Sequence, residues 1–182
     1  MGVRAGSWLL ALTALLGACS SEEPPGALPP VPSLGPSPSR EPAPNAPPLE
    51  AMNESSAGAS AFARFFVLSI GTAFSTANPA LIAEHSATGC GGCDALIASA
   101  GELRSLGHRR IGGDYLDISA VSPAVVDGEV VVSISYRRSE GRVVDASGAT
   151  ISSAPPVPQT NAQMRLSRSS DTWLVKGYRT VG

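Results

Sequence analysis

ASAFARFFVLSIGTAFSTA, residues 59–77, is the stretch that decides the fold of this chain. It contains all 4 phenylalanines of the sequence. Its apolar residues recur at spacings of three and four, the period that places side chains on one face of an α-helix. They are Phe62, Phe65, Phe66, Ile70, Ala73, Phe74 and Ala77. We expect a long helix over residues 59–77 whose phenylalanine face lies in the core.

Two shorter helices are expected next. Asn78-Pro79 combines an N-cap residue with a proline at the first helical position, which predicts a short helix over residues 79–85. Residues 94–106 place four apolar side chains on one face, and Gly107 is a typical residue to end a helix. Those four side chains are Leu96, Ile97, Ala100 and Leu103.

The apolar period then shortens to two, which is typical of half-buried β-strands. Leu116, Ile118 and Ala120 alternate with polar or aromatic neighbours, and residues 129–137 alternate in the same way. The apolar set of this second segment is Val130, Val132, Ile134 and Tyr136. Both segments are therefore predicted to be strands that turn one row of side chains toward the helices.

The C-terminal third predicts further strands. Residues 142–152 indicate a weaker strand with a turn at Ala146-Ser147-Gly148. Residues 163–169 and 172–181 form a predicted hairpin around Ser170-Asp171. Helices followed by three to five antiparallel strands predict an α+β fold, in which N-terminal helices pack on one face of a curved antiparallel sheet.

The N-terminus has the composition of an export signal. Arg4 precedes an apolar run over residues 8–18, which is shorter than the roughly 20 residues of a membrane-spanning helix. The run ends in Leu16-Gly17-Ala18-Cys19, which resembles the lipobox at which bacterial lipoproteins are cleaved and lipidated. We expect residues 1–18 to be a lipoprotein signal peptide and Cys19 to carry a diacylglyceryl group that anchors the protein to the outer face of the cell membrane. The alternative is an ordinary secretory signal that a cysteine happens to follow.

Proline is concentrated in one segment, because 11 of the 16 prolines lie between Pro24 and Pro48. Residues 19–58, which begin with the lipidated cysteine, have few large apolar side chains and are expected to form a disordered Pro-rich linker. At about 3.1 Å per residue, polyproline-II geometry would let the linker reach on the order of 100 Å. It would act as a spacer, or alternatively as a ligand of a proline-binding module. Residues 59–182 remain for a single domain.

The charge balance excludes one class of partner. The formal net charge is −2, and only 5% of residues are aromatic. From Ala59 onward, 11 Lys and Arg face 10 Asp and Glu. Such a domain lacks the cationic face on which counterion release depends, and it has few rings to stack on bases. We therefore expect no nucleic acid partner.

The order of helices and strands resembles the nuclear-transport-factor-two-like (SnoaL-like) fold, a cone-shaped α+β domain. More closely, the chain resembles an uncharacterised, domain-of-unknown-function family of actinobacterial lipoproteins. This resemblance rests on the lipobox and spacer, Ala61-Phe62-Ala63-Arg64-Phe65-Phe66, Cys90-Gly91-Gly92-Cys93, Gly112-Gly113 and Asp171-Thr172-Trp173-Leu174-Val175. It covers the whole exported domain and implies the cone-shaped fold, but the family brings no known activity.

Cys90 and Cys93 are the two thiols that remain when Cys19 carries lipid. In an oxidising compartment such a close pair favours a disulfide. A redox role is the alternative, because a Cys-x-x-Cys pair at a helix N-terminus can have a lowered thiol pKa. A thioredoxin-like fold, however, would have a strand directly before the pair, and none is predicted. Zinc is a third interpretation, although only His85 and His108 could complete a four-ligand site. We predict a Cys90–Cys93 disulfide and no metal site.

No catalytic motif stands out in the sequence. His85 and His108 are both expected to be solvated, one at a helix end and one in a turn. Enzymes with the cone-shaped fold often hold an acid or base inside the cavity, and the possible counterparts are Asp114, Tyr115, Asp117 and Tyr136. Asp114 and Asp117 have opposite pleat parity, so one sheet face can carry both only if a bulge intervenes.

These observations favour a non-catalytic module without a cofactor. It would bind a small apolar ligand or a neighbouring envelope protein, through a cavity or through the open face of its sheet. The residues expected to line a cavity are Phe66, Phe74, Tyr115, Tyr136 and Trp173. Two alternatives are a small-cavity enzyme of the isomerase or hydratase type and an envelope thiol-disulfide oxidoreductase that uses Cys90 and Cys93.

Overall fold

A computed structural model describes residues 45–181 of the chain. The predicted signal peptide, the lipidation site Cys19 and the predicted linker up to residue 44 lie outside the described residues. Within residues 45–181, helices come first and antiparallel strands follow, which confirms the predicted α+β fold class.

The described residues begin with four helical segments: the 3-10 helix η1 Leu49–Met52, then α1 Ser56–Thr76, α2 Ala80–Ala83 and α3 Gly91–Ser105. α1 begins before the predicted residue 59 because Ser55 is its N-cap, and the Ser55 hydroxyl accepts a hydrogen bond from the Gly58 N–H at 3.1 Å. The start of α3 is capped by the Cys90 sulfur, which accepts from the Cys93 N–H at 3.3 Å. The three predicted helices are confirmed, each with a shifted boundary.

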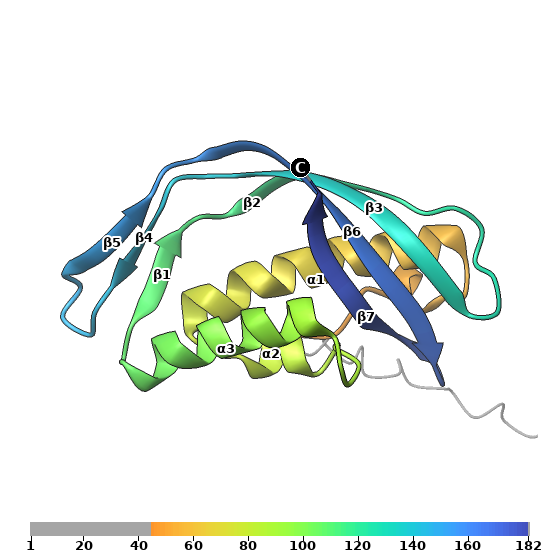
Figure 1. The fold of residues 1–182 in the computed structure, drawn as a ribbon, viewed down its shortest axis with the longest axis horizontal. Helices are drawn as coiled ribbons and strands as arrows, with labels where there is room; N and C mark the ends of the chain where they lie inside the picture. Colours follow the sequence, from red (N-terminus) through yellow and green to blue (C-terminus); the bar gives the residue numbers. More distant parts are fainter. Residues whose placement is uncertain (1–44, 182) are drawn as a thin grey trace, which may run out of the picture. The chain divides into compact units, whose positions relative to one another are not determined.

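Seven strands follow in the described part of the chain: β1 Arg109–Gly112, β2 Tyr115–Val121, β3 Glu129–Arg138, β4 Gly141–Val144, β5 Thr150–Ala154, β6 Val157–Ser169 and β7 Thr172–Val181. They form two antiparallel sheets, in the orders β1-β4-β5 and β2-β3-β6-β7. Two residues separate β3 from β4, and two separate β5 from β6, so each sheet continues into the other (Figure 1).

The strand count differs from the three to five expected. β1 was not predicted because Arg109 and Arg110 give no apolar alternation, yet Arg110 pairs in register with Val143 of β4. The predicted weak strand over residues 142–152 is two strands, joined by the expected turn. In that turn the Asp145 carboxylate accepts hydrogen bonds from the N–H groups of Ser147 and Ala149, both at 2.9 Å.

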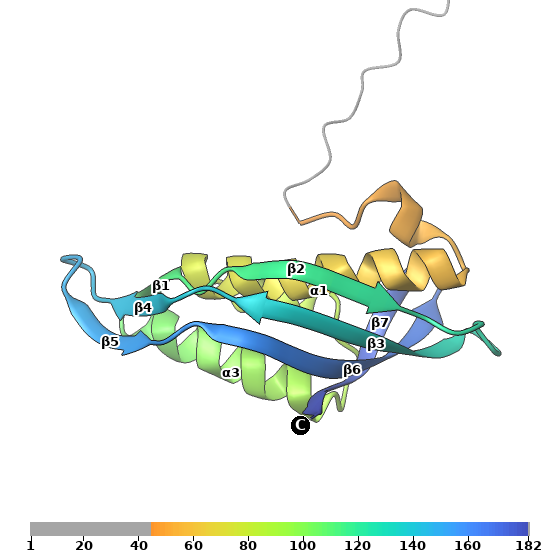
Figure 2. The same ribbon diagram turned by 90° about the horizontal axis from the view of Figure 1, so that it is seen from above.

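The helices all lie on one side of the sheets (Figure 1). α1 contacts β1, β2 and β3, whereas α3 contacts α2 and the edge strand β7. Seen from above, β2, β3 and β6 lie in front of the helices, and none of the described helices covers them (Figure 2). We call the side toward the helices the inner face of the four-stranded sheet and the opposite side its outer face.

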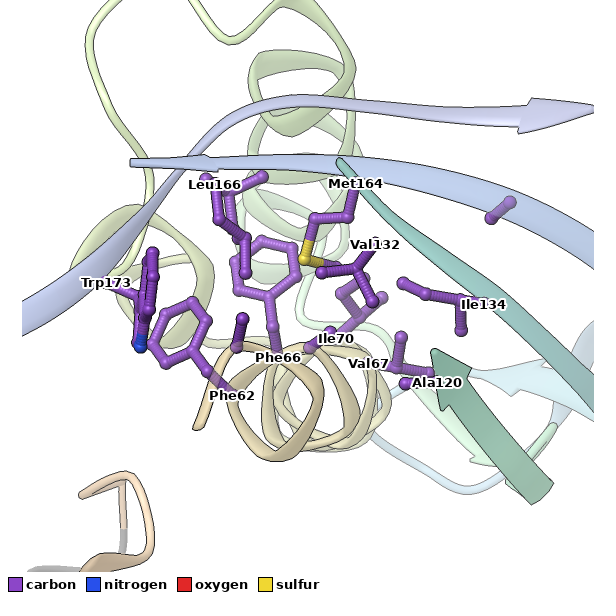
Figure 3. Packing of buried hydrophobic residues seen from close by; sticks show 14 of the residues in the cluster. Phe62, Phe66, Val67, Ile70, Ala120, Val132, Ile134, Met164, Leu166 and Trp173 are labelled. Atoms are coloured by element: carbon purple, nitrogen blue, oxygen red, sulfur yellow. The ribbon is translucent and has the colours of Figure 1, made fainter. Parts of the chain in front are cut away.

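The core lies between α1 and the inner face (Figure 3). Phe62, Phe66 and Ile70 of α1 have no exposed surface, which confirms that this helix packs by its phenylalanine face. They belong to one cluster with Val132, Ile134, Met164, Leu166, Trp173 and Val175 from three strands. By length and apolar composition α1 could also cross a membrane, but a buried core helix meets the same test.

The ordered fold begins before the predicted boundary at residue 59. Ala51 of η1 is buried, and the indole N–H of Trp173 donates to the Asn53 carbonyl at 3.2 Å. A side chain at Gly58 would lie 2.1 Å from the same carbonyl, so only glycine permits this approach. The part of the predicted linker from residue 45 onward therefore belongs to the domain.

Candidate functional site

The Cys90–Cys93 pair forms a disulfide at the start of α3. Neither cysteine has any exposed surface. The loop before the pair is bound to the edge of β7, since Val175 accepts from the Ala87 N–H and donates to the His85 carbonyl, both at 2.9 Å. The disulfide therefore lies inside a packed junction between α2, α3 and β7, where it closes a short loop.

A bulge in β2 changes which residues face inward. The pairing of β2 with β3 shifts between Leu116 and Ser119, and Asp117 takes a left-handed conformation with φ of 51°. Ile118 and Ala120, after the bulge, face the core as predicted. Before the bulge the parity is reversed, so Tyr115 packs on the core and Leu116 is 40% exposed. The predicted inward position of Leu116 is wrong.

A second bulge, in the β6–β7 hairpin, also changes which residues face the core. Arg165 pairs with Gly177, but the next residue, Leu166, pairs with Val175, which leaves Lys176 as the extra residue. Tyr178 consequently packs on the core, where strict alternation from Val175 would have turned it outward. Two bulges thus bring two tyrosines to the inner face.

These tyrosines meet Tyr136 of β3 and form what we call the tyrosine–arginine cluster: Arg110, Tyr115, Tyr136, Tyr178 and Phe74. The hydroxyls of Tyr136 and Tyr178 are 3.0 Å apart, and the ring centroids of Tyr115 and Tyr136 are 5.0 Å apart, edge to face. The Arg110 guanidinium lies 4.7 Å from the Phe74 ring centroid. The Arg110 Nε is buried and has no hydrogen-bond partner among the described residues.

Burial controls the ionisation of this cluster. It raises the pKa of the Tyr115 and Tyr178 hydroxyls, and the hydrogen bond to Tyr136 raises the pKa of Tyr178 further. Burial lowers the pKa of the Arg110 guanidinium. These two phenols therefore stay neutral near pH 7. The cluster can donate hydrogen bonds, but none of its members is a carboxylate that could serve as a base.

The residues predicted to line a cavity separate into two groups. Phe66 and Trp173 have no exposed surface, so they are solid core and line no cavity that water could enter, which corrects the prediction for both. Phe74, Tyr115 and Tyr136 come together in the tyrosine–arginine cluster. The alternation of apolar residues in the sequence did not indicate Arg110 or Tyr178, because neither is among the side chains that were predicted to face the helices.

The other polar candidates do not meet in one place. A bulge does occur at Asp117, which is the condition under which one sheet face could carry both Asp114 and Asp117. The Asp117 carboxylate, however, forms an exposed ion pair with Arg137. Asp114 is exposed. Among residues 45–181, no group of three or more His, Cys, Asp and Glu is placed to hold a metal ion.

The two histidines differ from the solvated pair that was expected. His85 is only 8% exposed and packs edge-on against the rings of Phe62 and Phe65. Its Nε2 lies 3.3 Å from the Asn45 carbonyl oxygen, and burial lowers its pKa. His108 is half-buried and lines an open hollow at the ends of α1 and α3. The predicted solvation of His85 is therefore wrong.

A different hollow, of about 420 Å³, lies on the outer face and extends around the edge strand β7, where the backbone of Tyr178 approaches the start of α3. It is lined by Gly92, Val131, Gln163, Arg165, Gly177, Tyr178 and Arg179. Gly177 pairs with Arg165 and has no side chain to fill the space beside it. A side chain at Gly92 would lie 1.9 Å from the Tyr178 carbonyl oxygen, so this glycine allows α3 to approach β7. We call this feature the outer hollow.

Comparison with known proteins identifies the fold. No protein-family model matches the sequence, and no curated protein sequence matches it significantly. The intermembrane space region of the chloroplast protein ARC6 is similar over 68% of this chain and 96% of that one, with 14% identity and a TM-score of 0.52.

Two further solved structures give lower scores. Aln2 from a Streptomyces species covers 65% of this chain and 85% of its own, with 16% identity and a TM-score of 0.40. An uncharacterized protein with a cystatin-like fold from Caulobacter vibrioides covers 61% and 81%, with 13% identity and a TM-score of 0.36. The similarity to the ARC6 region, together with the order of helices and strands, supports the expected nuclear-transport-factor-two-like α+β fold, while identities this low carry nothing about activity.

Proposed function

We propose that this protein is a membrane-anchored, non-catalytic module of the cell envelope that binds a protein partner on the outer face of its four-stranded sheet. The observation that carries the proposal is the contrast between the filled inner face and the outer hollow. Phe66 and Trp173, which would have lined a ligand cavity, have no exposed surface. Val131, on the other face, is 44% exposed beside a hollow of about 420 Å³.

The anchor is the second part of the proposal. Leu16-Gly17-Ala18-Cys19 supports lipidation of Cys19 on the outer face of the cell membrane, and the Pro-rich residues that follow support a spacer role. Metabolic labelling with a fatty-acid probe should mark the wild-type protein and leave Cys19→Ser unmarked. Equal labelling of both proteins would contradict the anchor. The same features support membership of the uncharacterised family of actinobacterial lipoproteins.

A small-cavity enzyme or a binder of a small apolar ligand is the alternative, and one observation favours it. Arg110 forms no ion pair with any described residue, and its guanidinium carbon lies 6.0 Å from the ring centroid of Tyr115. A guanidinium without an acidic partner among aromatic rings suits a small ligand that has an apolar body and one acceptor group. The thiol-disulfide oxidoreductase is less well supported, because attack on a disulfide needs access to sulfur and neither cysteine is exposed.

Native mass spectrometry separates these proposals. The full chain would be extracted from its own envelope in detergent, once as wild type and once as Gly177→Leu. Leucine at this position would fill the outer hollow without changing charge, and its Cβ would meet nothing closer than Arg165 at 3.8 Å. We expect a protein partner in the wild-type spectrum and its loss in the variant. A small-molecule adduct present in both proteins would instead support the cavity alternative.

A further inference from the structure

The outer hollow carries positive charge that no described residue neutralises. Arg165 and Arg179 both line it, and no Asp or Glu does. The two ion pairs found within residues 45–181 join Arg137 to Asp117 and Lys176 to Glu129. Neither of them involves Arg165 or Arg179. The hollow is therefore a place where two guanidinium groups lie without a carboxylate partner.

An acidic side chain close to Arg165 is already paired with a lysine. Glu129 lies close enough to Arg165 to feel its charge, but its carboxylate accepts a hydrogen bond from the Lys176 ammonium at 2.7 Å. Its main electrostatic partner is that lysine. Since the Glu129–Lys176 pair is neutral as a unit, it leaves the positive charge of Arg165 and Arg179 uncompensated on this part of the sheet.

One of the two guanidinium groups is held in place by a neutral neighbour. The Nε–H and an Nη2–H of Arg179 donate to the Gln163 Oε1, at 3.2 Å and 2.6 Å. An arginine has five N–H donors, so three remain available on a group whose orientation is already restricted. Because the Arg179 guanidinium is already ordered, binding a planar acceptor costs less entropy.

Charge also decides between the possible occupants. A second copy whose two-fold axis passes through the hollow would bring Arg165 and Arg179 against their own equivalents, and like charges across an interface cost affinity. A phosphate polymer would need many more free cations than two, in a chain whose net charge is −2. A single carboxylate on a protein segment matches two guanidinium groups beside the apolar surface of Val131.

We propose that the outer hollow binds an acidic side chain, presented by a segment of a partner protein that lies across β3, β6 and β7. The carboxylate contacts Arg165 and Arg179, and the flanking residues of the segment pack on Val131 and over Gly177. This inference rests on the proposed function, because it specifies the chemistry of the partner that the outer face would bind.

Site-specific photo-crosslinking in cells tests the inference with the full chain in its own envelope. A photoreactive amino acid replaces Val131 in the hollow or, as a matched control, Ile151, an exposed residue on β5. The Val131 position should give an adduct whose cross-linked peptide contains Asp or Glu, and the Ile151 position should not. Adding Arg165→Glu or Arg179→Glu should lower the Val131 adduct about tenfold. Arg142→Glu, the same charge change at an exposed site on β4, should leave it intact.

The outcomes separate this inference from the proposed function. If the adduct survives both charge reversals but disappears with Gly177→Leu, a partner binds the outer face and the acidic contact is wrong. If Val131 gives no adduct with any protein, both proposals fail. An adduct to lipid, to a phosphate polymer, to a second copy or to residues 20–44 of this chain also overturns the inference. Circular dichroism of each variant checks that its fold is retained.

Discussion

The inner and outer faces of the four-stranded sheet are built from the same strands, but they differ in burial and in the side chains that they present. In β3, Val130, Val132 and Ile134 are buried against α1, while Val131 and Ser133 between them are exposed. Successive side chains of a strand point to opposite faces, so one segment can serve a core and a surface independently. The inner face stabilises the fold, and the outer-face side chains Val131 and Ser133 take no part in that core.

The strongest test of this comparison removes the largest inner side chain. Trp173→Ala should lower the free energy of unfolding by about 3–5 kcal/mol, because it deletes a fully buried indole and its hydrogen bond to Asn53. Val131→Ala, on the outer face of the same sheet, should change it by no more than about 0.5 kcal/mol. Urea unfolding of both variants measures the difference. Similar losses for both would mean that the two faces are not energetically distinct.

The disulfide gives the next largest effect. Replacing both cysteines, with Cys90→Ser and Cys93→Ser together, should lower the free energy of unfolding by about 2 kcal/mol, the chain-entropy value for so short a loop. Because both sulfurs are buried, the wild-type protein should also resist alkylation in mild reductant until it unfolds. Rapid alkylation of the folded protein would mean that Cys90 and Cys93 are accessible to reductant, and it would favour the thiol-disulfide oxidoreductase alternative.

The inward position of Tyr178, which follows from the bulge in β7, can be tested by measuring stability at alkaline pH. Its pKa is raised by burial, so above about pH 10 the unfolded chain loses the phenolic proton while the folded chain keeps it, and stability falls as pH rises. Tyr178→Phe should make that fall smaller. The variant should also cost about 1 kcal/mol at pH 7, because it removes the hydrogen bond to Tyr136. An unchanged alkaline slope would indicate that Tyr178 is not on the inner face.

The smallest effect concerns His85, which packs at the edge of the same core. Burial lowers its pKa, so below about pH 6.5 the unfolded chain binds a proton that the folded chain does not, and stability falls as pH drops. His85→Gln should flatten this slope in unfolding experiments between about pH 7.5 and pH 5. A slope that persists in the variant would have to come from other groups and would contradict the buried position.

Much of the fold could be predicted because its signals are local. The phenylalanine periodicity of α1, the alternation in β3 and the turn at Ser170-Asp171 each depend on residues within one segment. β1 was missed because Arg109 and Arg110 are polar residues in a short strand. Only the pairing of these residues with β4 identifies the segment as a strand. The contribution of residues 45–58 was missed for the same reason, since Trp173 binds Asn53 from far along the chain.

The candidate site was less predictable than the fold. Tyr115 and Tyr136 were recognised as candidates, but Tyr178 and Arg110 join them only through the bulges and through β1. No sequence motif indicates the outer hollow. Arg165 and Gly177 read as ordinary residues of a hairpin, and the hollow follows from their direct pairing across two strands.

By itself, the sequence determined that helices precede the antiparallel strands, which helix face is buried and that Cys90 pairs with Cys93. These depend on short-range periodicity and spacing, which the geometry of a single helix, strand or loop dictates. Only the tertiary structure decided where the strands shift register. A bulge is defined by two residues opposing one on a neighbouring strand, so it has no meaning until that neighbour is known. Two such shifts turned Tyr115 and Tyr178 inward and left Arg165 beside Gly177 on the outer face.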